Sequence, residues 1–123
     1  MKKIIIIDDD KAFLEEFSGS LTLEGYQAIC LTDEEALLDE IQREKPDLIF
    51  LDLKMKKVNA FKFAGELTKE KKTSAIPLVA VTGVYVEDEF NMIMKSCGIM
   101  SCLTKPVDIV SAVKTIEALC LKK

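Results

Sequence analysis

The stretch IIIIDDD at residues 4–10 decides the fold of this chain. Four β-branched apolar residues in a row are typical of a strand buried on both faces, as in a parallel sheet covered by helices. The run ends in three acidic residues, and in open α/β sheets ligands bind beyond the carboxyl ends of the strands. These acids therefore indicate part of a metal site. An alternative stays open at this point, in which one Asp caps the following helix and the others are solvated.

Length, composition and charge are those of one globular domain. The chain has 123 residues, 49% hydrophobic and 31% charged, so it can bury a core without disulfides or metals. We therefore expect residues 1–123 to form a single domain. The net charge of −4 argues against direct binding of nucleic acid. Only four apolar residues separate the N-terminal lysines from the acids, too few for a signal peptide or a membrane span, so we expect a cytoplasmic protein without membrane contact.

Histidine is absent from the sequence, and this absence limits the possible chemistry. It excludes Ser-His-Asp and Cys-His catalysis, imidazole metal ligands and a phosphohistidine carrier. The four cysteines, Cys30, Cys97, Cys102 and Cys120, form no Cys-x-x-Cys pair. We interpret them as small buried residues of a reducing compartment and not as zinc ligands or disulfides. Any chemistry must therefore use carboxylates, hydroxyls and lysine.

Strand patterns and amphipathic helix patterns alternate five times along the chain. Strands are expected at about 3–8, 26–31, 48–51, 78–81 and 99–104. Helices are expected at about 11–24, between 33 and 46, at about 60–71 and 87–97, and from 108 onward, with caps at Asp10, at Thr32 or Asp33, at Asn59 and at Asp108. The second helix is expected to bury Ala36, Leu37, Leu38 and Ile41, and the last one Val110, Val113, Ile116 and Leu119. This alternation predicts an α/β fold, a parallel sheet with helices on both faces.

Polar side chains directly follow four of the expected strands. They are Asp8 and Asp9, Asp52, Thr82 and Lys105. Because the carboxyl ends of parallel strands meet at one edge of a sheet, we expect these side chains to converge. Carboxylates, a hydroxyl and an ammonium group in one place suggest phosphoryl transfer to a carboxylate.

Each of these residues has a role in such a reaction. Asp52 is the candidate nucleophile, which would become an aspartyl phosphate. Together with Asp8 and Asp9 it supplies the hard oxygen ligands that Mg²⁺ prefers, and the metal offsets charge on the transferring group. Lys105 can pair with a phosphoryl oxygen, and the Thr82 hydroxyl can donate a hydrogen bond to another.

These residues make the chain resemble the CheY-like receiver domains of two-component response regulators, and the resemblance extends over its whole length. The matching pieces are the acid pair at 8–9, Asp52 in LDLKM, Thr82 in VTG and Lys105 in LTKP. The resemblance implies a single doubly wound, flavodoxin-like sheet of five parallel strands in the order 2-1-3-4-5, with five helices in three α/β/α layers. It implies that a sensor histidine kinase or a histidine phosphotransfer protein donates a phosphoryl group to Asp52. It also implies a phosphorelay signalling protein that catalyses only its own phosphorylation and dephosphorylation, and is otherwise not an enzyme.

The resemblance further implies how the site is assembled. Mg²⁺ is expected to bind Asp9, Asp52 and the backbone carbonyl of Lys54, with Asp8 acting partly through water. A cis bond before Pro106 is expected to turn Lys105 into the site, and Gly83 follows the switch residue Thr82. The signal is expected to leave through the last helix–strand–helix face, about residues 86–121.

The chain departs from the usual pattern of the family in one loop and at one further residue. The loop after Asp52 commonly carries Pro-Gly and Asp-Gly, whereas this chain has Lys56-Lys57 and Asn59-Ala60. A left-handed Lys57 would cost on the order of 1 kcal/mol, so we expect the loop to follow another path. Cys102 stands at the usual place of an aromatic switch residue. The space that it leaves near Thr82 is expected to be filled by Tyr85 or Met100.

Two other functions remain as alternatives. A small phosphatase of the haloacid dehalogenase type also uses Asp-x-Asp after its first strand, but it needs later acids and a longer chain. A degenerate receiver would act only as an interaction module, as the altered loop and Cys102 slightly favour. No effector follows in this sequence, so output is expected through a downstream protein partner or through an effector domain missing from it. The receiver is expected to be a monomer or a weak, phosphorylation-dependent dimer.

Overall fold

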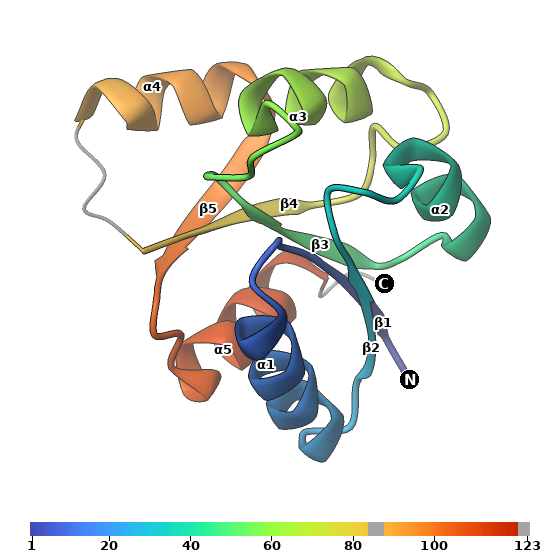
Figure 1. Cartoon of the computed structure of the whole chain (residues 1–123), viewed down its shortest axis with the longest axis vertical. Helices are drawn as coiled ribbons and strands as arrows, with labels where there is room; N and C mark the ends of the chain where they lie inside the picture. The colour runs from blue at the N-terminus through green and yellow to red at the C-terminus, as the bar shows by residue number, and fades with distance from the viewer. Residues whose placement is uncertain (84–87, 121–123) are drawn as a thin grey trace.

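The computed structural model, which describes residues 1–83 and 88–120, contains one sheet of five parallel strands with helices on both faces (Figure 1). In chain order the elements are β1 (Lys3–Ile7), α1 (Lys11–Leu23), β2 (Gln27–Leu31), α2 (Leu37–Glu44), β3 (Leu48–Asp52), α3 (Ala60–Lys69), β4 (Leu78–Thr82), α4 (Asp88–Ser96), β5 (Ile99–Thr104) and α5 (Ile109–Leu119). The strand order is β2-β1-β3-β4-β5, which confirms the predicted fold class. No helix in the described ranges is long and apolar enough to cross a membrane.

The alternation of side chains along β1 divides the core into two halves. Ile4 and Ile6 belong to a cluster with residues of α1 and α5, whereas Ile5 and Ile7 belong to a cluster with residues of α2, α3 and α4. Figure 1 shows the same division, with α1 and α5 on one side of the sheet and the other three helices on the opposite side. All four isoleucines are at most 1% exposed, as expected for a central strand covered on both faces.

The helix starts agree with the expected caps at three places out of four. The side chains of Asp10, Asn59 and Asp108 accept backbone N–H groups in the first turns of α1, α3 and α5. The prediction that Thr32 or Asp33 caps the second helix is wrong, because α2 begins only after Ala36, and no described side chain caps it. The segment between β2 and α2 forms turns instead, which leaves the Asp33 carboxylate for another partner.

Several burial predictions are also wrong. Ala36 is exposed, and Val110 is 55% exposed because it lies on the outer side of α5, while Ala112 and Ile116 face the core. The four cysteines are not buried, since Cys30 is exposed and the other three are partly exposed, and no disulfide joins them within the described part of the chain. The spacing of apolar residues in the sequence does not distinguish a residue at the exposed edge of a helix's apolar face from a buried one at its centre.

Gly98 marks the close approach of α4 to α3. Its backbone has φ +91°, and a Cβ atom built on it would lie 2.2 Å from the Thr68 Oγ1 atom. The Thr68 hydroxyl donates to the carbonyls of Ala64 or Cys97, at 2.9 and 2.8 Å, so its position is defined by both helices. A residue with a side chain at position 98 must strain the backbone and displace Thr68.

We therefore predict that Gly98→Ala lowers the free energy of unfolding by roughly 2–4 kcal/mol, the sum of a left-handed backbone penalty and overpacking. Gly19→Ala is the matched control. Gly19 lies within α1, and an added Cβ there meets nothing within 4 Å, so this change is expected to stabilise by about 0.5–1 kcal/mol. Urea unfolding of both variants measures the difference. Equal stability of the two variants would contradict the close helix contact.

Candidate functional site

The pairing of the strands brings the predicted site residues to one edge of the sheet. Ile7 of β1 lies opposite Leu51 of β3, so the next residues along the two strands, Asp8 and Asp52, are neighbours. Asp52 is opposite Val81, which places Thr82 one residue beyond on β4. These are the carboxyl ends of the strands, where α/β sheets bind ligands.

Three carboxylates form a compact cluster at this edge. One oxygen from each of Asp8, Asp9 and Asp52 lies within 4.8 Å of the others. Asp8 is 1% exposed and Asp52 5% exposed, whereas Asp9 is partly exposed. Backbone N–H groups hold the buried pair in place, because Asp10 donates to Asp8 Oδ1 at 2.9 Å and Lys54 donates to Asp52 Oδ1 at 3.1 Å.

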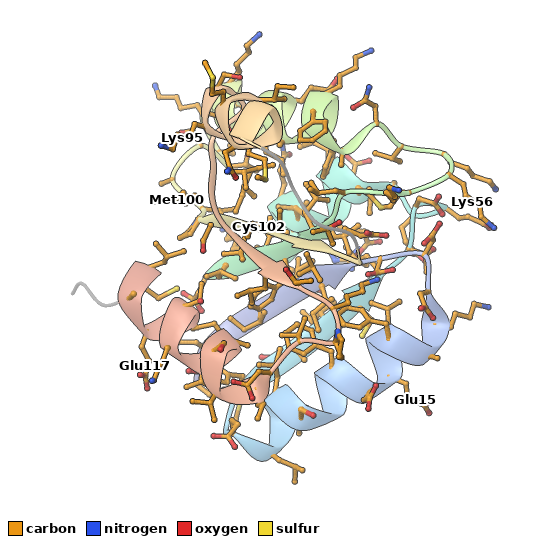
Figure 2. All side chains as sticks on the ribbon, turned by 90° about the vertical axis from the view of Figure 1, so that its left-hand side faces the viewer. Glu15, Lys56, Lys95, Met100, Cys102 and Glu117 are labelled. Atoms are coloured by element: carbon orange, nitrogen blue, oxygen red, sulfur yellow. The ribbon has the colours of Figure 1, made fainter. Side chains whose placement is uncertain are left out.

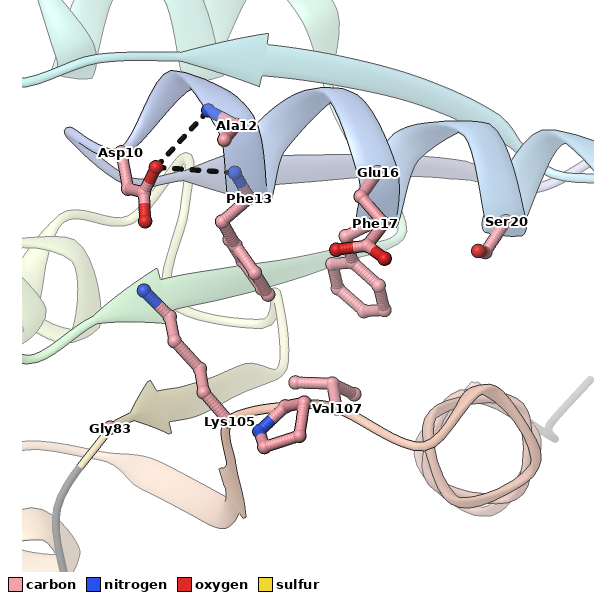
Figure 3. Close-up of a pocket in the computed structure, with 10 residues that line it drawn as sticks. Asp10, Ala12, Phe13, Glu16, Phe17, Ser20, Gly83, Lys105 and Val107 are labelled. Carbon is pink, nitrogen blue, oxygen red and sulfur yellow. Dashed lines mark hydrogen bonds between the residues drawn. The ribbon is translucent and has the colours of Figure 1, made fainter.

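Asp10 has a different task from the other two acids of its run. Its side chain accepts the N–H groups of Ala12 and Phe13 at 3.1 and 3.3 Å and so begins α1 (Figure 3). The capping interpretation of the acidic run therefore holds for Asp10, whereas Asp8 is buried and not solvated. One aspartate caps the helix, and the other two face Asp52.

Lys105 places a positive charge against the cluster. Its Nζ atom lies 2.8 Å from Asp8 Oδ2 and 4.3 Å from the centre of the Phe13 ring, in a cation–π contact (Figure 3). Its backbone N–H donates to the Thr82 carbonyl at 2.7 Å, and the Lys105–Pro106 peptide bond is cis. The ends of β4 and β5 are thus joined directly at the site.

The donor set suits a hard divalent cation such as Mg²⁺. All three side chains offer carboxylate oxygens, the ligands that Mg²⁺ prefers. Asp8 Oδ2 is buried, and no described residue donates a well-angled hydrogen bond to it, although the Lys105 ammonium lies close by. A buried oxygen that is satisfied only by a nearby charge fits a site that takes a cation.

The pKa of Asp52 is raised to about 6, chiefly because burial disfavours its charged form. The hydrogen bond from the Lys54 N–H opposes this shift, the negative charge of Asp8 adds to it, and the positive charge of Lys105 opposes it. One acid of the cluster therefore has its pKa above the usual range of an aspartate. Asp52 still ionises below neutral pH, so it is mainly a carboxylate at pH 7.

The remaining predicted positions lie around this centre. Thr82 is 1% exposed at the end of β4, and Gly83 lines a cavity with Lys105 and Pro106. Cys102 lies within β5, is partly buried, and packs against the α2–α3–α4 side of the core.

The expectation that Met100 fills space near Thr82 is wrong. Met100 is 60% exposed and lies at the start of β5, whereas Thr82 pairs with Thr104 near the end of that strand (Figure 2). Tyr85, the other residue expected to fill this space, lies outside the described residues. The backbone of Lys57 is not left-handed, because Lys45 is the one non-glycine residue with positive φ in the described ranges. The loop after Asp52 therefore follows another path, as expected.

Phe13 is the site residue that the sequence analysis did not identify. It stacks on Phe17 with ring centres 5.3 Å apart, and both rings line a cavity of about 420 Å³ between α1 and the segment after β5 (Figure 3). In the sequence it appears only as one apolar residue of an amphipathic helix. Its place in the first turn of α1, three residues after Asp10, was the available signal for a contact with the site.

Comparisons with known proteins agree on one family. A family model described as the response regulator receiver domain matches residues 4–117. Protein PilH of Pseudomonas aeruginosa is 33% identical over 118 residues, which cover 96% of this chain and 97% of PilH. The DNA-binding dual master transcriptional regulator RpaA of Synechocystis is 33% identical over 123 residues, which cover 97% of this chain and 49% of RpaA. The chain therefore spans nearly all of PilH and about half of RpaA.

Solved structures show the same architecture. The signal receiver domain of a DNA-binding response regulator from Colwellia psychrerythraea superposes with a TM-score of 0.89 at 25% identity, covering 99% of this chain and 100% of that one. Chemotaxis protein CheY4 of Vibrio cholerae also has a TM-score of 0.89, at 23% identity, covering 97% of this chain and 98% of that one. At this identity the second likeness concerns the fold alone.

The raised pKa of Asp52 predicts how stability depends on pH without metal. A carboxyl whose pKa is higher in the folded state stabilises the fold at low pH, and this contribution is lost as pH rises from about 4 through about 6. Asp52→Asn is expected to remove this dependence and, in EDTA at neutral pH, to raise the free energy of unfolding by about 1–2 kcal/mol, allowing for solvent screening at the sheet edge.

Urea unfolding of both proteins across this pH range measures the effect, and Asp10→Asn is the matched control because Asp10 lies outside the cluster. An Asp52→Asn protein less stable than the parent at neutral pH would show that the Lys54 hydrogen bond outweighs the cost of burying the charge.

Proposed function

We infer the function from family and site together: the chain belongs to the response regulator receiver domain family, and we propose that it accepts a phosphoryl group on Asp52 as a signal. The observation that supports this most is the position of Asp52, buried beside two further carboxylates and faced by the charge of Lys105. We propose residues 1–123 as one receiver unit, which acts in the cytoplasm. Receiver domains in general transmit signals and do not turn over substrates.

The chain contains no histidine, so a phosphohistidine that donates to Asp52 lies outside it. We assign this role to a sensor histidine kinase or a histidine phosphotransfer protein. A carboxylate oxygen of Asp52 forms a bond to phosphorus while the N–P bond of the partner's phosphohistidine breaks, and the imidazole leaves with the electron pair and takes up a proton. The pKa of Asp52, about 6, leaves it mostly ionised and nucleophilic at neutral pH.

The chain's residues orient the transferring group. Asp8, Asp9, Asp52 and the backbone carbonyl of Lys54 would hold Mg²⁺, which when bound offsets negative charge on the phosphoryl oxygens. Lys105 exchanges its pairing with Asp8 for a phosphoryl oxygen, and the Phe13 ring keeps its ammonium at the site. The Thr82 hydroxyl donates to another phosphoryl oxygen.

The same residues connect the site to a switch. The backbone bond from Lys105 to Thr82 joins the ends of β4 and β5, so a movement of either residue is transmitted to both strands. The signal then leaves through α4, β5 and α5, with Cys102 in place of the usual aromatic side chain and Gly83 and the cis Pro106 as backbone supports. Output would pass to a downstream protein or to an effector domain, by a monomer or a weak phosphorylation-dependent dimer.

The two alternatives receive less support. The family model that matches the chain is that of the receiver domain, which does not support a haloacid dehalogenase phosphatase. Turnover of a phosphomonoester would be the test for phosphatase activity. A receiver that acts only as an interaction module has no need to bury carboxylates next to each other at a cost in stability. Titration with beryllofluoride and Mg²⁺ separates this alternative from the proposal, because an interaction module would not respond.

The assignment of Asp52 predicts which variants take up phosphate. After incubation with acetyl phosphate and Mg²⁺, the intact mass of the parent is expected to increase by one phosphoryl group, whereas Asp52→Asn stays unmodified. Asp9→Ala is expected to need roughly tenfold more Mg²⁺ for the same extent, because a metal ligand is lost.

Asp10→Asn is the control for this experiment. It keeps the oxygen that caps α1, and it is expected to react like the parent. Phosphate uptake by Asp52→Asn equal to that of the parent would refute the assignment.

A further inference from the structure

The loop between β3 and α3, residues 53–59, carries the Lys54 carbonyl and is held at both ends. At its start the Lys54 N–H donates to the Asp52 carboxylate at 3.1 Å. At its end the Asn59 side chain accepts the Lys62 N–H at 3.2 Å and begins α3. The middle of the loop contains Lys56 and Lys57, which are exposed, with Lys56 projecting outward in Figure 2.

A contact with the segment after β2 holds the middle of the loop. The Lys57 backbone N–H donates to Asp33 Oδ2 at 2.9 Å. The Lys57 Nζ atom also lies 3.2 Å from Glu34 Oε2, but these two side chains are 63% and 69% exposed, and such ion pairs contribute little. A backbone N–H bound to a carboxylate is stronger and less mobile, so Asp33 is the anchor.

Asp33 makes this bond in place of the one that its sequence position suggests. It stands shortly before α2, where an aspartate commonly caps the helix, yet α2 begins after Ala36, and no described side chain caps it. The carboxylate is thus directed away from its own helix toward the loop that follows Asp52. Asp33 therefore connects the β2–α2 and β3–α3 segments, beside the exposed ion pair of Lys57 with Glu34.

The anchor and the acid cluster border the same cavity. A cavity of about 360 Å³ lies between these two segments and the start of α1, and its lining includes Asp9, Asp33 and Lys57. Asp9 also contributes an oxygen to the three-carboxylate cluster. The two residues joined by the Lys57–Asp33 bond therefore line the same cavity as Asp9.

We propose that Asp33 is a positioning residue for the metal site. By accepting the Lys57 N–H it keeps the 53–59 loop in the path that leaves the Lys54 carbonyl within reach of a cation at Asp9 and Asp52. This inference rests on the proposed function, which assigns that carbonyl to Mg²⁺. Apolar contacts compete with the anchor, since Leu53, Met55 and Val58 are partly buried against the core and also hold the loop.

Titration of the full chain with Mg²⁺ by isothermal calorimetry tests the proposal with two variants. Asp33→Ala removes the acceptor and is expected to weaken Mg²⁺ binding roughly tenfold, the usual scale for a residue that orients a metal ligand. Asp33→Asn removes the charge but keeps an oxygen that accepts the same N–H, and is expected to stay within about twofold of the parent. Glu34→Gln removes the neighbouring charge without touching this bond, and it is the matched control, also within about twofold.

Hydrogen exchange of the Lys57 amide, followed by NMR, reports on the anchor without any metal. Exchange is expected to be faster in Asp33→Ala and near the parental rate in Asp33→Asn. If Asp33→Ala releases the Lys57 amide and still binds Mg²⁺ like the parent, the apolar contacts suffice and the proposal is overturned. If Asp33→Asn loses as much affinity as Asp33→Ala, the effect is one of charge, which also overturns it. Absence of Mg²⁺ binding by the parent would instead overturn the proposed function and this inference with it.

Discussion

The ion pair between Lys105 and Asp8 is the interaction on which the site depends. Three carboxylates at one sheet edge repel each other, and burial adds to the cost of their charge. Lys105 follows β5, which is separated from β1 by β3 and β4, so its side chain extends across the ends of two strands to reach Asp8. The Phe13 ring supports the ammonium from α1. The charge that balances the cluster is therefore held by parts of the chain about a hundred residues apart.

The sheet supplies the rigid frame for this arrangement. Backbone hydrogen bonds join each strand end at the site to its neighbour: Asp8 donates to Leu31, Leu53 to Val81 and Lys105 to Thr82. The carboxylates of Asp8 and Asp52 each accept the N–H group of the residue two positions further along. These bonds hold the charged groups in place before any ligand arrives, and such preorganisation is what phosphoryl transfer requires of a protein.

The loop after Asp52 shows how a departure from a family pattern is accommodated. With lysine and not glycine at position 57, the backbone does not adopt a left-handed conformation there. The Lys57 N–H group donates to Asp33, which lies in the segment between β2 and α2. The exposed lysines of this loop and the acidic residues of the β2–α2 segment line the same cavity beside the site. The rim of the site therefore carries both positive and negative charges. A partner that docked over the site would meet this rim, and the charges of the rim would affect the rate of encounter more than the affinity.

The sequence by itself determined the fold class, the strand order through a family resemblance, and the edge at which the polar residues meet. It could do so because burial on both faces demands the uninterrupted apolar runs seen at 4–7 and 48–51, and because a parallel sheet aligns whatever follows them. Only the tertiary structure decided that Lys105 pairs with Asp8 over Phe13 and that Asp33 serves the β3–α3 loop and not α2. It also decided that Val110 is exposed and that none of the cysteines is fully buried. The physical reason is that a side chain's partner depends on distances between segments remote in sequence, whereas periodicity and capping preferences describe only neighbours along the chain.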